Sequence, residues 1–281
     1  MPPIPPVIPL IAALAAFAGE APGPTVATED TMRTEVPEVL VRAPRVTLDE
    51  ILDRVARGEA RRDSALRDMS FMATFRLMGR TNDPKKAPEL LSETVLQVFK
   101  KKPDKVRSIV LRQFSIDPDD DEQGVDVEFR SGMDEQIVNF AFRPEARAQY
   151  RYEILGREVL GNHLIYRIGF TPRSNLDPSN PKGLVWIDTN EFVIVRQEVG
   201  FERSPVPLFL KGIDRMVIER KKYGDHWALN RVLLRASLPF ALPIPKIGAK
   251  IGKSFDMTMF FENYQINSGL PDSLFASRKK S

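Results

Sequence analysis

Apolar residues recur at helical spacing in the segment that begins near residue 47. Positions three or four residues apart lie on one face of a helix, and the residues between them here are mostly charged. Thr47 can cap the first turn, and Glu50 follows it at the spacing of a capping box. The pattern predicts an amphipathic helix over residues 47–61 that can continue to residue 66. Its apolar positions are Leu48, Ile51, Leu52 and Val55.

From residue 69 onward apolar and polar residues alternate, which is typical of strands with one buried face. Turn residues separate most of these segments, so the strands should pair antiparallel, and so wide a sheet twists and curls. The sequence predicts a mainly β fold: a curved antiparallel sheet that forms an incomplete (half) β-barrel of about 11 strands. One N-terminal amphipathic helix and short covering helices complete it. The expected strands span residues 69–79, 94–100, 105–116, 125–130, 136–143, 152–160, 163–172, 183–189, 192–203, 214–223, 227–238 and 255–267.

Large apolar side chains gather on one face of this predicted sheet. The expected helix and two short turns, within 204–211 and 243–251, offer little area to cover that face, so part of it should border an apolar cavity. The same residues could fill an ordinary core, and each one alone fits that alternative better. As a set they predict a ligand-binding cavity lined by Phe71, Phe75, Phe140, Phe142, Tyr166, Phe170, Val195, Met257 and Met259.

The N-terminus has an apolar run over residues 7–18 whose length suits a signal peptide and is short for a membrane span. The run ends in a sequence that fits the small-x-small cleavage rule. No Lys or Arg precedes it, so a late start codon, an uncleaved anchor and an apolar tail without an export role stay open. We expect a periplasmic protein with a signal peptide at 1–18, a flexible leader at 19–45 and one half-barrel domain at 46–281.

Composition narrows the class of protein. Lys and Arg number 41 against 38 Asp and Glu, and the two signs interleave along the chain, which does not favour a nucleic-acid binder. The chain has no Cys, which excludes disulfides, thiolate metal sites and a Cys nucleophile. His163 and His226 stand beside predicted turns without a third metal ligand at a suitable spacing. We therefore expect no catalytic residue, no metal and no cofactor.

Three loops allow two interpretations each. The acidic loop 117–124 has Asp at several EF-hand positions, but Glu122 stands where the turn needs Gly, so a solvated hairpin tip is favoured over weak calcium binding. Residues 239–253 are apolar, rich in Pro and interspersed with Lys, which suits a lid or a membrane contact as well as a structural loop. Residues 204–212 suit either a cavity mouth or a plug at the edge of the core.

Several motifs resemble the outer-membrane lipoprotein-sorting family, the LolA-like and LolB-like proteins. The run GLVWIDTNEFVIVRQE at 183–198 resembles the central hairpin of that family. Residues 221–227 and the closing FENYQIN segment at 261–267 continue the similarity, and LDEILDRV at 48–55 resembles its first helix. The resemblance covers residues 47–275.

The resemblance implies an incomplete antiparallel barrel wrapped over helices, with a cavity for lipoprotein acyl chains or other lipids in the periplasm. It implies no catalytic residue, and it makes Arg76 a candidate for the arginine in the cavity of these carriers. We therefore expect a periplasmic carrier or chaperone for outer-membrane lipoprotein sorting, in transient contact with a membrane surface or an envelope protein. An envelope sensor or scaffold on the same fold is the alternative, and a hydrolase with a carboxylate pair in its cavity is a third interpretation.

Overall fold

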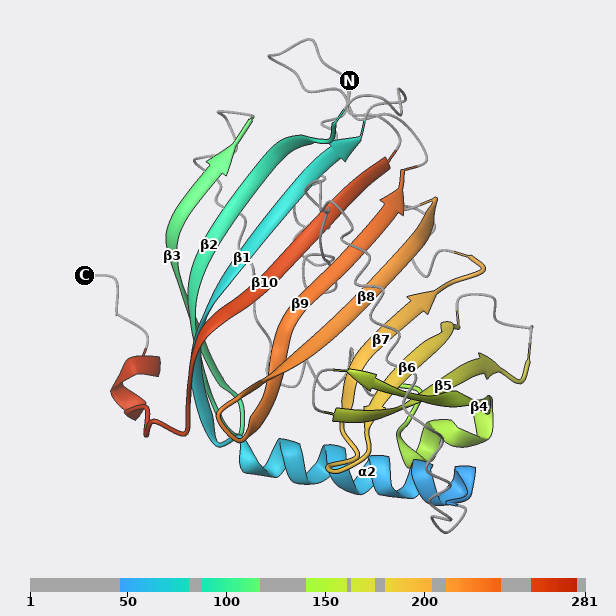
Figure 1. Cartoon of the computed structure of the whole chain (residues 1–281). Coiled ribbons are helices and arrows are strands. Elements are labelled where there is room, and N and C mark those ends of the chain that lie inside the picture. Colours follow the sequence, from blue (N-terminus) through green and yellow to red (C-terminus); the bar gives the residue numbers. More distant parts are fainter. Residues whose placement is uncertain are drawn as a thin grey trace.

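The strands expected from the alternating pattern form one sheet. The structure, a computed structural model, describes residues 46–80, 87–116, 140–160, 163–174, 180–203, 211–238 and 254–276. Within these ranges ten strands pair in the order β3-β2-β1-β10-β9-β8-β7-β6-β5-β4 (Figure 1). They are β1 (Asp68–Arg80), β2 (Glu89–Lys101), β3 (Lys105–Ser115), β4 (Tyr150–Leu160), β5 (His163–Pro172), β6 (Lys182–Asp188), β7 (Ile194–Gly200), β8 (Gly212–Tyr223), β9 (His226–Ser237) and β10 (Ser254–Ile266). The helical elements are α2 (Leu48–Ala65) and the 3-10 turns η2 (Pro144–Gln149) and η3 (Asp272–Phe275).

The predicted half-barrel is confirmed, because all pairings are antiparallel and the two margins of the sheet, β3 and β4, are not paired with each other. The prediction of a strand over 136–143 is wrong in its described part, because residues 140–143 form a turn that leads into η2. Pro144 disfavours a continuing strand there, since it lacks an amide hydrogen. The other predictions that lie outside the described residues concern 1–18, 19–45, 117–124, 125–130, 204–210 and 239–253.

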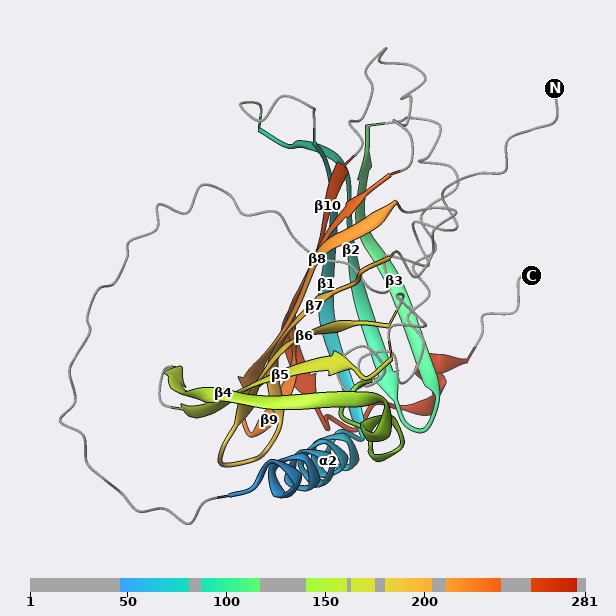
Figure 2. The same ribbon diagram turned by 90° about the vertical axis from the view of Figure 1, so that its right-hand side faces the viewer.

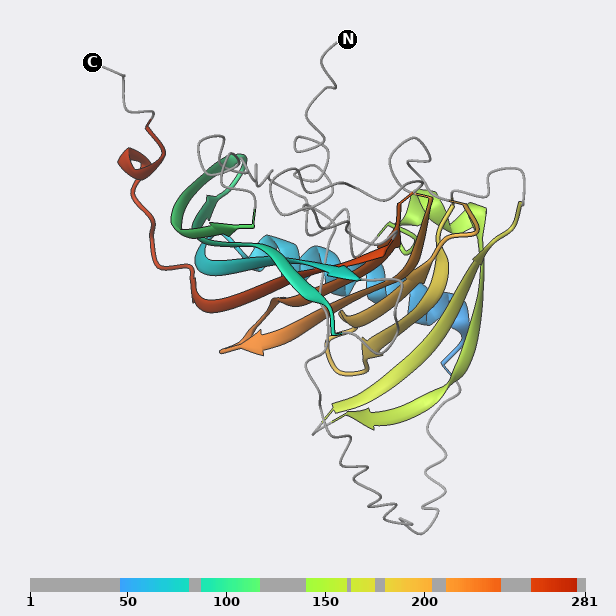
Figure 3. The same cartoon turned by 90° about the horizontal axis from the view of Figure 1, so that it is seen from above.

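Curvature turns the sheet into an open trough, which Figure 3 shows from above. In the view of Figure 2, β4 and β5 run nearly across the direction of β2 and β3. Register shifts interrupt several ladders, for example between Ile154 and Gly156 and between Trp186 and Ile187. Gly156 has a φ of 146°, a conformation that other residues rarely adopt. Such bulges bend a strand and increase its twist, so they help to curl the sheet.

The helix α2 lies across one end of the trough (Figure 1). Its predicted N-cap is confirmed, since the Glu50 amide donates a hydrogen bond to Thr47 Oγ1 at 3.2 Å. Ile51, Leu52 and Val55 are buried in the same apolar cluster as the sheet. The apolar stripe read from the sequence therefore faces the concave side of the trough.

An apolar row runs across the concave face from strand to strand. Directly opposite residues on neighbouring strands share one face of a sheet, so the register defines this row. From β2 to β4 it contains Thr94, Phe75, Met259, Val232, Ile218, Gln197, Val185, Ile168 and Ile154. Most of these residues belong to one buried cluster that reaches from β2 to Tyr150 of β4. Thr94 and Gln197 are the polar members of an otherwise apolar row.

The opposite, convex face is held by ion pairs between neighbouring strands. Asp256 is fully buried and accepts a hydrogen bond from Arg235 Nε at 2.7 Å, and Arg80 contacts its other oxygen. Glu93 lies between Arg76 and Arg112 in the same way. These arginines are partly exposed, so solvent screens most of the pairs and each contributes modestly to stability.

Candidate functional site

Eight of the ten residues predicted to line a cavity lie in the main apolar cluster or pack against it. Phe140 and Phe142 both meet the ring of Phe170 edge-on, with ring centroids 5.8 Å apart in each pair. The eight are Phe71, Phe75, Phe140, Phe142, Tyr166, Phe170, Met257 and Met259. The structure therefore brings these side chains together on one surface, and the cavity itself stays a prediction.

Arg76 and Val195, the other two predicted residues, lie outside this cluster. Arg76 follows Phe75 in the strand, and successive side chains point to opposite faces, so its guanidinium lies on the convex face. There Arg76 Nε donates to Glu93 Oε2 at 2.6 Å. Val195 lies at the register shift in the β6–β7 pairing and packs in a second, smaller cluster with Ile165, Val193 and Trp227.

Gln197 is a polar residue of the concave face that the sequence pattern did not reveal. It lies opposite Ile218 on one neighbouring strand and Val185 on the other. Its side chain is fully buried, and neither its amide oxygen nor its amide nitrogen has a hydrogen-bond partner. An unpaired buried amide costs free energy, so this position is a weak point of the apo core or a contact for a ligand.

At the base of the trough, buried charges join α2 to the sheet. Glu59 of α2 accepts hydrogen bonds at Oε1 from Arg220 Nη1 at 2.7 Å and from the Ile194 amide at 2.8 Å. Arg62 Nε lies 3.3 Å from Glu59 Oε2. Burial would raise the pKa of Glu59, but the guanidinium groups of Arg220 and Arg62 outweigh it and hold that pKa below its ordinary value. The carboxylate is therefore charged at neutral pH.

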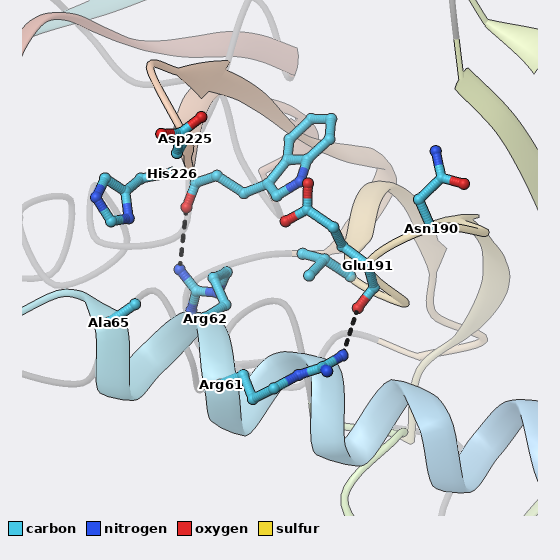
Figure 4. Close-up of a pocket in the computed structure, with 10 residues that line it drawn as sticks. Arg61, Arg62, Ala65, Asn190, Glu191, Asp225 and His226 are labelled. Atoms are coloured by element: carbon cyan, nitrogen blue, oxygen red, sulfur yellow. Dashed lines mark hydrogen bonds between the residues drawn. The ribbon is translucent and has the colours of Figure 1, made fainter.

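A pocket of about 320 Å³, here named the base pocket, opens beside this cluster (Figure 4). Three parts of the chain form it: α2, the turn between β6 and β7, and the turn between β8 and β9. Its lining residues are Gly58, Arg61, Arg62, Ala65, Asn190, Glu191, Val193, Asp225, His226 and Trp227. The base pocket differs from the predicted cavity in place and in chemistry, since more than half of its lining residues are polar or charged.

The turn between β6 and β7 gives the base pocket a defined wall. Asp188 Oδ1 accepts hydrogen bonds from the amides of Asn190 at 2.9 Å and Glu191 at 2.7 Å, which closes the turn. Asp188 Oδ2 lies 2.6 Å from His163 Nδ1. Gly58 lets α2 approach the turn closely, because a Cβ there would lie 2.3 Å from the Phe192 carbonyl oxygen. These contacts fix the turn against the helix.

Both histidines of the chain lie near Trp227. Within the part of the chain that the structure describes, no group of three or more His, Cys, Asp or Glu side chains gathers as metal ligands would. His163 is engaged with Asp188 at the start of β5, and His226 lines the base pocket. The ring of His163 also meets the ring of Trp227 edge-on, with the ring centroids 5.5 Å apart. No described helix combines the length and hydrophobicity needed to cross a membrane.

The motifs that resemble the lipoprotein-sorting family occupy the elements expected of them. The run over 183–198 forms the β6–β7 hairpin, the segment 48–55 begins α2, and FENYQIN ends β10. The sheet forms an open antiparallel trough with this helix across its end. The fold resembles that of the LolA-like proteins. No protein-family model matches this sequence, and no curated protein matches it either.

Several solved structures are similar to this chain at low sequence identity. A DUF1329 family protein from Desulfovibrio piger is 14% identical, covers 81% of this chain and 96% of its own, and has a TM-score of 0.41. A LolA superfamily protein from Nitrosomonas europaea is 14% identical over 83% of this chain and 98% of its own, with a TM-score of 0.35. An outer-membrane lipoprotein-sorting protein domain from Vibrio parahaemolyticus is 14% identical over 80% and 95%, with a TM-score of 0.34.

Proposed function

We propose that the protein is a non-enzymatic carrier of the periplasm that binds the acyl chains of a lipoprotein, or another lipid, against the concave face of its sheet. The largely apolar row across the open trough supports this proposal. Burial of an acyl chain there would contribute about 0.8 kcal/mol per CH₂ group, so a long chain is held firmly. The N-terminal apolar run supports export as the first step.

An acyl ligand needs an adaptable wall, and methionine supplies one. Met257 and Met259 lie side by side along β10 on the concave face, and Met216 joins them from β8. Methionine side chains are unbranched and polarizable, so they repack around ligands of different shape at little cost. Release would follow when the trough hands the chain to a membrane surface or an envelope protein.

Lipid capture tests the proposal. The protein is purified from the envelope of its own host and analysed by native mass spectrometry, and the empty protein is titrated with a fluorescent fatty acid. We expect copurified lipid and saturable binding. Protein that is isolated empty and that ignores the fatty acid would contradict the proposal.

Two substitutions on opposite faces of the sheet sharpen this test. Met259→Gln keeps the side-chain length but places an amide on the concave face, so acyl binding should weaken by about tenfold. Arg76→Gln alters the convex face and should leave binding unchanged. Equal effects of both variants would place the ligand elsewhere.

A second candidate function is an envelope sensor or scaffold that binds a protein partner. It is favoured by the margin strand β3, where Val110 and Leu111 are 53% and 55% exposed. Exposed apolar margin strands recruit extended peptides, which add to the sheet through main-chain hydrogen bonds. The variant Leu111→Lys separates the two functions, since it should abolish capture of an envelope partner while fatty-acid binding survives.

A further inference from the structure

The base pocket contains buried hydrogen-bond donors that have no partner. Arg62 Nε and Nη2 and Trp227 Nε1 are all buried and make no hydrogen bond. The side chain of Arg62 is only 4% exposed. Its Nη1 is engaged at 3.5 Å with the Trp227 carbonyl oxygen, and the Glu59 oxygen near Nε does not complete a hydrogen bond. Among the described residues that line the pocket, the buried polar atoms without a hydrogen-bond partner are thus all donors.

The charged groups at the rim of the pocket also favour an anionic ligand. Figure 4 shows Arg61 extending from α2 toward the main-chain carbonyl of Glu191, and Arg62 extending toward the Trp227 carbonyl oxygen. The Glu191 carboxylate is paired with Lys222, which compensates its charge. Asp225 adds one negative charge to the lining. Two guanidinium groups therefore face a wall whose acids are partly neutralised, which favours one further negative charge but not several.

We propose that the base pocket binds the carboxylate group of a small organic acid through the guanidinium of Arg62 and the indole N–H of Trp227. Arg62 Nε already faces the Glu59 carboxylate at 3.3 Å, so Nη2 of Arg62 and the indole N–H of Trp227 are the two donors left for the oxygens of a ligand. The volume corresponds to about ten water molecules, which suits a short acid. This site lies apart from the concave face and goes beyond the carrier function.

Tryptophan fluorescence gives a direct test, because the chain has only two tryptophans. The variant Trp186→Phe leaves Trp227 as the single reporter, beside the proposed ligand. This protein is titrated with sodium butyrate, with sodium chloride at equal ionic strength as the blank, and with inorganic phosphate. We expect a saturable change with butyrate and a weaker response to phosphate. A response no larger than that of chloride, or tighter binding of phosphate, would overturn the assignment.

Removal of each donor tests the residues named. Arg62→Met in the Trp186→Phe background should weaken butyrate binding by about tenfold or more, since a hydrogen bond to a charged group is lost. Trp227→Phe, compared with Trp186→Phe by calorimetry, should weaken it as well and keeps the aromatic shape if Arg62→Met does not fold. Unchanged affinity in a folded variant of either residue would overturn the proposal.

A long-chain fatty acid serves to test whether the carboxylate in the base pocket belongs to a separate short acid or to a fatty acid bound at the concave face. If the short acid has its own site, Met259→Gln weakens the binding of the fatty acid and leaves the binding of butyrate unchanged. If Met259→Gln weakens the binding of both ligands, they share one site and the inference is overturned. Butyrate binding in a protein that takes up no fatty acid would sink the carrier proposal and leave this one intact.

Discussion

The concave face and the base of the trough are both buried, yet different forces hold them. The concave face consists of apolar side chains whose neighbours are set by strand register. The base depends on hydrogen bonds between charged groups, such as Glu59 and Arg220, which are 161 residues apart in the sequence. Apolar surfaces tolerate replacements of similar volume, whereas buried polar contacts require one geometry. The first region can therefore adapt to a ligand, and the second fixes the helix against the sheet.

We expect the largest loss of stability at the base of the trough, in the variant Glu59→Gln. This variant leaves Arg220, whose side chain is 1% exposed, and Arg62 without their carboxylate. Removal of one partner from a buried ion pair costs about 3–5 kcal/mol. We expect the free energy of unfolding, measured in urea, to fall by that amount.

An exposed ion pair provides the control for this variant. Glu202 contacts Lys182 at 2.6 Å on the surface, with side-chain exposures of 53% and 45%. Glu202→Gln should leave the unfolding midpoint unchanged, because solvent already screens that pair. Similar losses of stability in both variants would mean that the buried Glu59 contacts stabilise the protein no more than an exposed ion pair.

A smaller loss is expected when α2 is pushed away from the β6–β7 turn. In Gly58→Ala, the added Cβ would lie 2.5 Å from the Glu191 carbonyl oxygen, so backbone atoms have to move. We expect a loss of about 1–3 kcal/mol in the free energy of unfolding. Gly200→Ala is the control, because a Cβ at residue 200 meets nothing within 4 Å. An unaffected Gly58→Ala protein would show that the helix docks more loosely than described.

The concave face could be predicted from the sequence because alternation and helical spacing are local signals. The N-cap at Thr47, the start of β1 within one residue of the expected position and the Asp188 turn all follow from neighbouring residues. The orientation of Arg76 also follows from alternation once Phe75 is placed on the concave face. Val195 does not, because a register shift between two strands leaves no mark in the sequence of one.

The base could not be predicted, because its contacts join distant segments. Glu59 and Arg62 read as members of a charged, solvated helix face in the sequence, yet both are buried, Glu59 against β7 and β8 and Arg62 beside Trp227 of β9. Gln197 was hidden for a similar reason, since a lone glutamine in a strand usually faces solvent. Only the pairing with Ile218 and Val185 places it inside.

Low pH should weaken the contacts of Glu59 that hold α2 against the sheet at the base of the trough. The folded-state pKa of Glu59 lies below its ordinary value of 4.5, so its contribution to stability is complete above that pH. The contribution is lost as the pH falls through the lower, folded-state pKa. We expect the difference in unfolding free energy between the wild type and Glu59→Gln to shrink over that range. A difference that stays constant with pH would show that the charge of Glu59 is not what stabilises the base.

The smallest effect, and the only gain, is expected on the concave face in Gln197→Met. Met has similar length and no polar atom, so the variant removes two unpaired buried groups and should raise the free energy of unfolding by about 1 kcal/mol. Gln97→Met is the matched control, because Gln97 donates a hydrogen bond to the Phe71 carbonyl oxygen at 3.2 Å and its loss should destabilise. If Gln197→Met also destabilises, the amide is paired in solution. If it stabilises the empty protein but weakens the binding of a fatty acid more than that of an alkane, the amide is kept for the polar end of the ligand.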